Sequence, residues 1–248
     1  MTDYQARTSV VSPPQPRSQP KYRPGTPKLH TTLMLALTFS TGIVDAIGYL
    51  ALDRVFTGNM TGNVVILGMA LTGSADLPIL GPVVALLMFF LGAMAAGRKL
   101  RGGTDGWNPS TTFILAAVAM VLALEGLILL VLGPMSLPYM TEAAAAGLGF
   151  AMGAQAAAAR QVKVADVTTV VVTSTITALA AESRFGAGTG QPWIKRLLAV
   201  VLILLGALAG AALLTLALWV PFALSAAITT TVVIAGHRRM KAESSAMH

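Results

Sequence analysis

The sequence predicts an all-α polytopic membrane protein with about six transmembrane helices and two short re-entrant or half-spanning helices. Three observations predict it. Of the 248 residues, 55% are hydrophobic and only 11% are charged, which is more apolar surface than a soluble domain of this length can bury. The apolar residues fall into eight segments separated by short polar connections. The 17 Lys and Arg residues cluster at the two ends of the chain and in a few connections, as membrane topology requires.

A basic, Pro-rich segment precedes the first apolar segment. Residues 1–30 carry six prolines and five basic residues and have no apolar core, so they fit neither a cleaved signal peptide nor a packed element. We expect a disordered cytosolic tail here. A transmembrane domain over 31–236 follows, with halves at 31–133 and 137–236, and then a second basic cytosolic tail over 237–248.

Six of the eight apolar segments are long enough to cross a bilayer. A helix rises about 1.5 Å per residue and needs roughly 17 to 20 residues to span. The second and sixth segments are shorter, and both are rich in Thr, Asn or Ser where they start. In chain order the segments are Thr31–Leu52, Met60–Gly73, Ile79–Gly97, Thr111–Leu132, Ala143–Ala159, Asp166–Ala181, Ile194–Leu214 and Leu216–Ala235.

The basic residues favour two re-entrant segments over eight full spans. If all eight segments crossed with the N-terminus inside, 11 basic residues would lie inside and 6 outside. If the second and sixth segments enter and return on the same side, 16 lie inside and only Arg54 lies outside. The second partition obeys the positive-inside rule. It places both termini in the cytosol.

This topology makes the two halves an inverted repeat. The first four segments begin inside and include a re-entrant piece from outside, and the last four do the reverse. A weak echo supports duplication: "GIVDA" (42–46) followed by "TGN" (61–63) resembles "MGAQA" (152–156) followed by "TST" (173–175). This alignment places Asp45 opposite Gln155.

Two acidic side chains and one amide side chain lie well inside predicted spans. Asp45 and Glu125 are acidic residues at membrane depth, and Gln155 is a milder case. A buried charge there costs a few kcal/mol and usually faces a partner or a wet cavity. We therefore take Asp45 and Gln155 as candidate solute-binding residues and Glu125 as a candidate proton-coupling residue. Hydrogen bonding between helices is the structural alternative.

The stretch "DRVFTGNMTGN" (53–63) is the most unusual local pattern. Its glycines permit close approach or special backbone conformations, and its Thr and Asn side chains can satisfy turns. A helix starting near Met60 would point its positive end toward the bilayer middle, as discontinuous transporter helices do. The second-half segment would do the same from the other face; turn chemistry in an ordinary loop is the alternative. The candidate binding residues are Asn59, Thr61, Gly62, Asn63, Thr173 and Thr175.

Other patterns predict packing. Gly206 and Gly210 form a GxxxG pair, as do Gly149 and Gly153, and the fifth segment, "AAAAGLGFAMGAQAAAA", consists almost entirely of small residues. Small residues let transmembrane helices approach closely. We expect these segments to face other helices rather than lipid.

Several chemistries are disfavoured by residue types. There is no Cys, and the three His residues fall outside the apolar segments, so the spans lack thiol or imidazole nucleophiles and metal ligands. No nucleotide-binding motif is present. We expect no enzyme activity, no cofactor, no metal and no nucleic-acid partner.

These residues resemble a known family. "GIVDAIGYL" with "VFTGNMTGNVVILGMAL" (42–71), together with the later Gly153-Ala-Gln155 and the Thr-rich sixth segment, is similar to the YoaK family, bacterial integral membrane proteins that contain a domain of unknown function. The resemblance covers about residues 30–236. It implies a bacterial cytoplasmic membrane and two related halves, and it supplies no substrate. Where the family pattern has Asn after the Gln and Gly after the Thr, this chain has Ala156 and Ser174.

Two function classes remain. The first is a gradient-driven small-solute transporter or channel whose polar site lies at the midplane, between the halves. The second is a non-transporting scaffold, assembly factor or lipid-interacting regulator. The partners expected are the lipid bilayer and an unidentified small solute, and homo-oligomerisation is left open.

Overall fold

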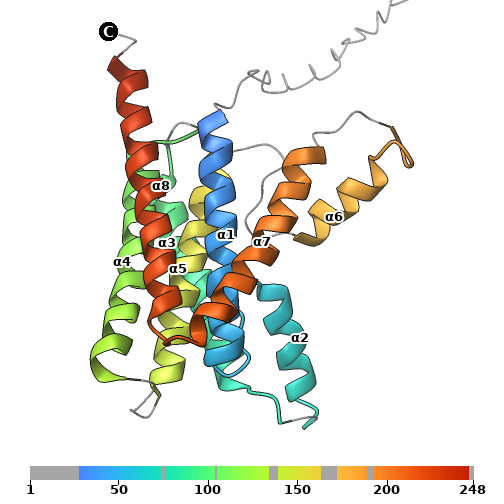
Figure 1. The fold of residues 1–248 in the computed structure, drawn as a ribbon, viewed down its shortest axis with the longest axis vertical. Coiled ribbons are helices and arrows are strands. Elements are labelled where there is room, and N and C mark those ends of the chain that lie inside the picture. The colour runs from blue at the N-terminus through green and yellow to red at the C-terminus, as the bar shows by residue number, and fades with distance from the viewer. Residues whose placement is uncertain are drawn as a thin grey trace, which may run out of the picture.

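The computed structural model describes residues 28–73, 76–103, 105–133, 139–162, 172–188 and 193–245. These ranges contain eight α-helices and no strand, so the predicted all-α class is confirmed (Figure 1). Most of the expected N-terminal tail lies outside them. The helices are α1 (Lys28–Ala51), α2 (Met60–Ala70), α3 (Leu80–Leu100), α4 (Pro109–Leu132), α5 (Met140–Val162), α6 (Val172–Ala181), α7 (Trp193–Leu214) and α8 (Val220–Ser245).

The long helices match the predicted spans. By length and composition, five helices of the described part can cross a membrane: α1, α3, α4, α7 and α8. Helix α5 has 23 residues, is less hydropathic because it is rich in Ala and Gly, and has eleven buried residues. It is enclosed by other helices, as its small side chains predicted.

Helix α8 is longer than predicted. The sequence placed a cytosolic tail over 237–248, whereas α8 continues to Ser245. Residues 237–245 contain no Gly or Pro to end the helix. Arg239 also forms an i,i+4 ion pair with Glu243 at 2.8 Å, which supports the exposed last turns.

Helix α2 lies in a re-entrant hairpin. Asp53 and Arg54, just after α1, have φ of 57° and 59°, and the chain then runs back along α1. The Val55 amide donates to the Gly48 carbonyl at 3.1 Å. Helix α2 therefore starts beside the middle of α1 and returns to the end at which α1 finishes (Figure 1). Its 11 residues extend about 16 Å, roughly half the hydrocarbon thickness.

The helix contacts follow the predicted inverted repeat. If α1–α4 are exchanged with α5–α8 in order, every contacting pair becomes another contacting pair or maps onto itself. The pair α1·α7 becomes α3·α5, α2·α3 becomes α6·α7, and α1·α8 becomes α4·α5, while α4·α8 and α1·α5 map onto themselves. Helices α4 and α8 lie on one side of the bundle, and α2 and α6 lie on the other (Figure 1).

Close glycine contacts fix the register between the halves. A methyl group on Gly42 would overlap the Ile203 carbonyl oxygen, and one on Gly206 would overlap that of Phe39. The same reciprocal arrangement joins the other pair of helices: Gly153 faces the Phe89 carbonyl and Gly92 faces that of Phe150. The packing role predicted for the GxxxG glycines is therefore confirmed.

This register corrects the sequence alignment by one residue. Gly42 corresponds to Gly153, so Asp45 corresponds to Ala156 rather than to Gln155. The sequence comparison paired one polar residue with another, whereas the structural equivalence is set by which residues touch the facing backbone. The first half thus has a carboxylate at a position where the second half has a methyl group.

A Trp-x-Pro motif at the start of the last helix of each half was missed by the sequence analysis. Trp107-Asn108-Pro109 begins α4 and Trp219-Val220-Pro221 begins α8. Gly236 of α8 packs against the Trp107 ring, and Gly126 of α4 packs near the Trp219 carbonyl and Phe222. Proline is favoured in the first turn of a helix, where its missing N–H is not needed. The paired motifs are an independent mark of the repeat.

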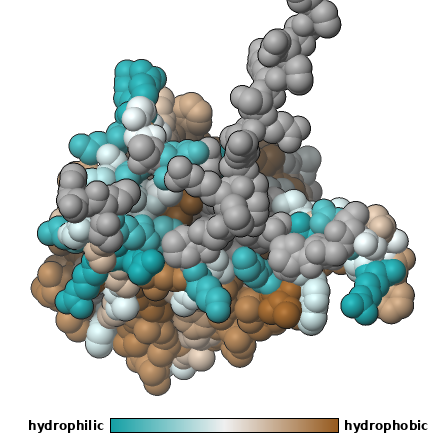
Figure 2. All heavy atoms as spheres, turned by 90° about the horizontal axis from the view of Figure 1, so that it is seen from above, coloured by the Kyte–Doolittle hydropathy of each residue, from teal (hydrophilic) through white to brown (hydrophobic). Residues whose placement is uncertain are grey.

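One end of the bundle is strongly polar. Helix α1 begins and α8 ends there (Figure 1). Figure 2 shows this end from above, with hydrophilic residues gathered over it and hydrophobic residues around the flank. The last turn of α3 contributes Arg98 and Lys99, and the connection after it contributes Arg101, all exposed. The basic end and the apolar flank are the arrangement expected of a membrane-embedded bundle.

Candidate functional site

A cavity of about 700 Å³ lies where the two short helices begin. It is bounded by α1, by α2 and the loop before it, by the first residues of α6, and by α7. Both halves of the repeat therefore contribute to it. Its lining residues are Thr41, Asp45, Tyr49, Phe56, Gly58, Asn59, Thr61, Gly62, Val65, Ile66, Val172, Thr173 and Ile203.

Asp45 holds the loop that leads into α2. Its Oδ1 accepts hydrogen bonds from the backbone N–H groups of Thr57 at 3.0 Å, Gly58 at 2.7 Å and Asn59 at 3.4 Å. Hydrogen bonds to an ionised carboxylate are stronger than neutral ones. One face of the side chain is thus committed to the re-entrant loop, while Asp45 also lines the cavity. Asp45 therefore fits both sequence interpretations: it makes structural hydrogen bonds within the protein, and it also lines the cavity.

The Asn63 side chain holds the same loop through hydrogen bonds to the Phe56 backbone. Its Oδ1 accepts from the Phe56 amide at 2.8 Å, and its Nδ2 donates to the Phe56 carbonyl. Asn63 is fully buried and does not line the cavity. The sequence predicted a binding residue here, but the structure gives Asn63 the role of replacing backbone pairing in a non-helical segment at membrane depth.

The other residues of this motif face the cavity. Asn59 is the N-cap of α2, and its Oδ1 accepts from the Gly62 amide at 3.2 Å. Thr61 is exposed to the cavity, and Gly62 lies against the Phe56 ring, where an added methyl group would overlap it. Neither Gly58 nor Gly62 is among the described residues with positive φ. These glycines are needed for close approach and not for a left-handed backbone.

The second half contributes less. Thr173 lines the cavity, whereas Thr175 is the only buried residue of α6 and lies away from it. Thr61 and Asn63 lie in the first turn of α2, and Thr173 and Thr175 lie among the first described residues of α6. The correspondence of TGN with TST stays a prediction, because α6 is described only from Val172 onward. Residues 163–171, which precede α6, lie outside the described residues.

Gln155 joins the two halves behind the cavity. Its Nε2 donates to Thr41 Oγ1 at 3.1 Å, across the α1·α5 contact. Gln155 is 1% exposed and does not line the cavity, whereas Thr41 does. The residue predicted to bind solute directly instead bonds to the side chain of a residue that lines the cavity.

Glu125 lies in a different place. It lines a hollow of about 220 Å³ between α4 and α5, with Met140, Ala143 and Ala144. Its Oε2 is buried and has no hydrogen-bond partner in the described part of the chain. The structure does not bring Glu125 to the cavity that Asp45 lines, so its coupling role stays a sequence prediction without geometric support.

Several residues that line the cavity were missed by the sequence analysis, and two of them are aromatic. Tyr49 and Phe56 bring their ring centroids to 5.0 Å and form an aromatic wall next to Asp45. Tyr49 lies one helical turn after Asp45, and that i,i+4 spacing was a signal that could have identified it. Among the described residues, no group of three His, Asp or Glu side chains could hold a metal ion. The cavity offers one carboxylate, hydroxyl and amide groups, and two rings.

Comparisons with known proteins support the assignment as a transmembrane protein. A family model described as "Protein of unknown function (DUF1275)" matches residues 33–235. The chain is 35% identical over 153 residues to the UPF0700 transmembrane protein YoaK of Bacillus subtilis (strain 168). This alignment covers 60% of the chain and 64% of that relative, so the chain spans slightly less than two thirds of the relative's length. No solved structure matches the chain.

Proposed function

Because the chain belongs to the DUF1275 family of proteins of unknown function, we propose a function from its geometry: a gradient-driven transporter or channel for a small solute. The observation that carries this proposal is the cavity of about 700 Å³ into which the first residues of α2 and α6 both project. Half-helices from two inverted repeats meet in this way at the binding sites of many secondary transporters. Absence of a nucleotide-binding motif favours a gradient as the driving force.

The proposed setting is the bacterial cytoplasmic membrane with both termini in the cytosol. The basic end of the bundle, where α1 begins and α8 ends, supports this orientation because cytosolic loops are enriched in Lys and Arg. Arg54 follows α1 at the other end of the bundle. The charge distribution therefore agrees with the six-span topology.

A second candidate, a non-transporting scaffold, assembly factor or lipid-interacting regulator, is favoured by a specific observation. Asp45, Asn63 and Gln155 all make hydrogen bonds within the protein. Such bonds suffice to explain polar side chains at membrane depth. The two candidates differ in whether water and solute enter the cavity.

Water access is tested with single cysteines, since the chain has no native Cys. We expect Thr61→Cys and Thr173→Cys to react with a membrane-impermeant thiol reagent in intact vesicles. Thr229→Cys is the control, because Thr229 is fully buried in α8 and should stay unmodified. If neither cavity position reacts from either face, the cavity is dry and the scaffold candidate stands.

Permeation is tested in proteoliposomes by light scattering with a panel of neutral, anionic and cationic osmolytes. We expect one class to permeate faster than in protein-free vesicles, and modification of Thr173→Cys to block it. Asp45→Asn separates the candidates. Loss of permeation at normal protein level supports transport, whereas a lower protein level without a specific flux defect supports the scaffold.

A further inference from the structure

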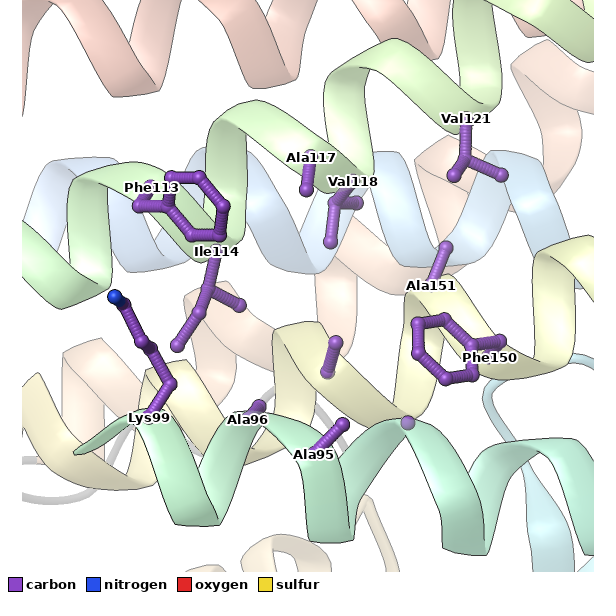
Figure 3. Close-up of a pocket in the computed structure, with 12 residues that line it drawn as sticks. Ala95, Ala96, Lys99, Phe113, Ile114, Ala117, Val118, Val121, Phe150 and Ala151 are labelled. Atoms are coloured by element: carbon purple, nitrogen blue, oxygen red, sulfur yellow. The ribbon is translucent and has the colours of Figure 1, made fainter. Parts of the chain in front are cut away.

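A second hollow lies far from the polar cavity, on the flank of the bundle. It has a volume of about 310 Å³, opens between α3 and α4, and has α5 as its floor. Helices α3 and α4 make few contacts with each other. The small side chains that line the space between them leave it unfilled. Figure 3 shows the α3 and α4 side chains facing each other across the groove, with Phe150 and Ala151 of α5 at one end. The small residues are Gly92, Ala95, Ala96, Ala117, Ala151 and Ala154.

The groove is nearly as long as the hydrocarbon part of one membrane leaflet is deep. On α3 it runs from Gly92 to Lys99, about 10 Å along the helix axis, and on α4 from Phe113 to Val121, about 12 Å. One leaflet of a bilayer has a hydrocarbon depth of about 15 Å. The groove therefore follows most of one leaflet, from the membrane surface inward.

Only one end of the groove is charged. The Lys99 ammonium lies 5.2 Å from the Phe113 ring centroid, which holds it over the groove (Figure 3). Arg98 and Arg101 are exposed at the same end, and Asp105 is the one carboxylate in the following connection. The opposite end is formed by Val121 and Phe150 and is apolar. This polarity matches a molecule with an anionic head and a hydrocarbon chain.

The charged end is not a by-product of the repeat. In the alignment of the two halves that makes Gly92 equivalent to Gly206, Lys99 is equivalent to Leu213. The second half has no cation at the equivalent position. Lys99 therefore distinguishes this groove from its counterpart between α7 and α8.

We propose that the groove binds one acyl chain of an anionic phospholipid, with the lipid phosphate at Lys99. A second copy of the protein fits less well. A helical segment 10 Å long and about 10 Å wide would occupy roughly 800 Å³, more than twice the volume of the groove. The site is independent of the proposed transport function.

The experiment measures quenching of a tryptophan in the groove by brominated lipid. Phe150→Trp places a reporter in the floor, and the parent protein supplies the background of the three native Trp residues. The protein is reconstituted in phosphatidylcholine vesicles that contain increasing fractions of brominated phosphatidylglycerol or brominated phosphatidylcholine. We expect phosphatidylglycerol to quench at the lower mole fraction.

Substitutions identify the two parts of the site. Lys99→Gln should reduce the preference for phosphatidylglycerol about fivefold, the effect of one cation near an anionic surface, and Lys99→Arg should retain it. Ala117→Leu fills the groove and should reduce quenching by both lipids; Ala117→Val is the smaller change if the leucine variant does not fold. Lys195→Gln is the matched control, because Lys195 is exposed in the first turn of α7.

Three outcomes would overturn the proposal. Equal quenching by brominated phosphatidylglycerol and brominated phosphatidylcholine shows that the groove has no headgroup preference. An equal effect of Lys195→Gln and Lys99→Gln shows that only general surface charge acts. A change in molecular mass from dimer to monomer with Ala117→Leu shows that a second copy occupies the groove.

Discussion

Asp45 joins the loop before α2 to α1, and its chemistry sets the first prediction. Asp45→Ala removes an acceptor that three backbone N–H groups share. Hydrogen bonds to a charged group contribute about 1.5–3 kcal/mol each, and three that share one oxygen contribute less than their sum. We expect Asp45→Ala to lower the free energy of unfolding by about 2–4 kcal/mol. Asp45→Asn keeps an acceptor oxygen and should cost less, which thermal unfolding in detergent would show. Equal stability of all three proteins would contradict this role.

Asn63 and Asn59 form a matched pair for a second prediction. Asn63→Asp keeps the acceptor for the Phe56 amide but loses the donor to the Phe56 carbonyl, in a fully buried place. We expect a loss of about 1–3 kcal/mol in stability. Asn59→Ser should be close to neutral, because Asn59 is exposed and serine is an equally good N-cap that adds no charge beside Asp45. Similar melting temperatures for the two variants would show that the loop does not depend on the Asn63 donor.

At the residue scale, the sequence predicted which segment borders the cavity but not which of its side chains line it. The unusual polarity of 53–63 marks the loop that borders the cavity. Asp45, Asn59, Thr61, Gly62 and Thr173 do line it, whereas Asn63, Gln155 and Thr175 do not. Residue type indicates that a side chain needs a partner, but which partner it finds depends on how the chain returns along α1. That three-dimensional path is not encoded in any local pattern.

The glycine contacts between long helices give a prediction at the scale of the element. Gly206→Ala places a methyl group against the Phe39 carbonyl, and neither backbone can move away cheaply. We expect a loss of about 1–3 kcal/mol from overpacking. Gly97→Ala is the control in α3, where no atom lies within 4 Å of the added carbon. It should be neutral or stabilise by up to about 1 kcal/mol through helix propensity. Thermal unfolding of the two variants would separate packing from propensity.

The repeat extends this prediction to the other half. Gly92 and Gly153 make the same reciprocal contacts as Gly206 and Gly42, so Gly92→Ala should cost about as much as Gly206→Ala. Both substitutions are in long helices of the described part. A large cost in one half alone, measured by the same unfolding assay, would show that the two interfaces are not energetically equivalent.

Element types were predictable because length and hydropathy decide them, and element ends were less so. The second and sixth segments were predicted to be too short to span; α2 has 11 residues, and the described residues of α6 number 10. The end of α8 was missed because a polar helix beyond the membrane has no hydropathy signal. The register of the repeat was missed by one residue because Gly-rich helices align equally well in neighbouring registers.

At the scale of the whole molecule, the halves meet at the starts of α2 and α6, and this gives the last prediction. Thr61 and Thr173 come from different halves and line the same cavity. A short bifunctional thiol reagent should therefore cross-link Thr61→Cys to Thr173→Cys, detected as a faster-migrating monomer on a denaturing gel. The control pair is Leu71→Cys with Thr173→Cys, since Leu71 lies about 15 Å further along the chain from Thr61, just beyond the end of α2.

The cross-link tests the inverted repeat more directly than any stability measurement. If all eight segments crossed the membrane, α2 and α6 would run its full depth and their first residues would lie at membrane surfaces. The re-entrant arrangement instead brings both starts to the interior, because the loop before α2 is held beside the middle of α1 by Asp45. Efficient linking of the control pair with none at Thr61 and Thr173 would overturn both the meeting of the half-helices and the transport proposal that rests on it.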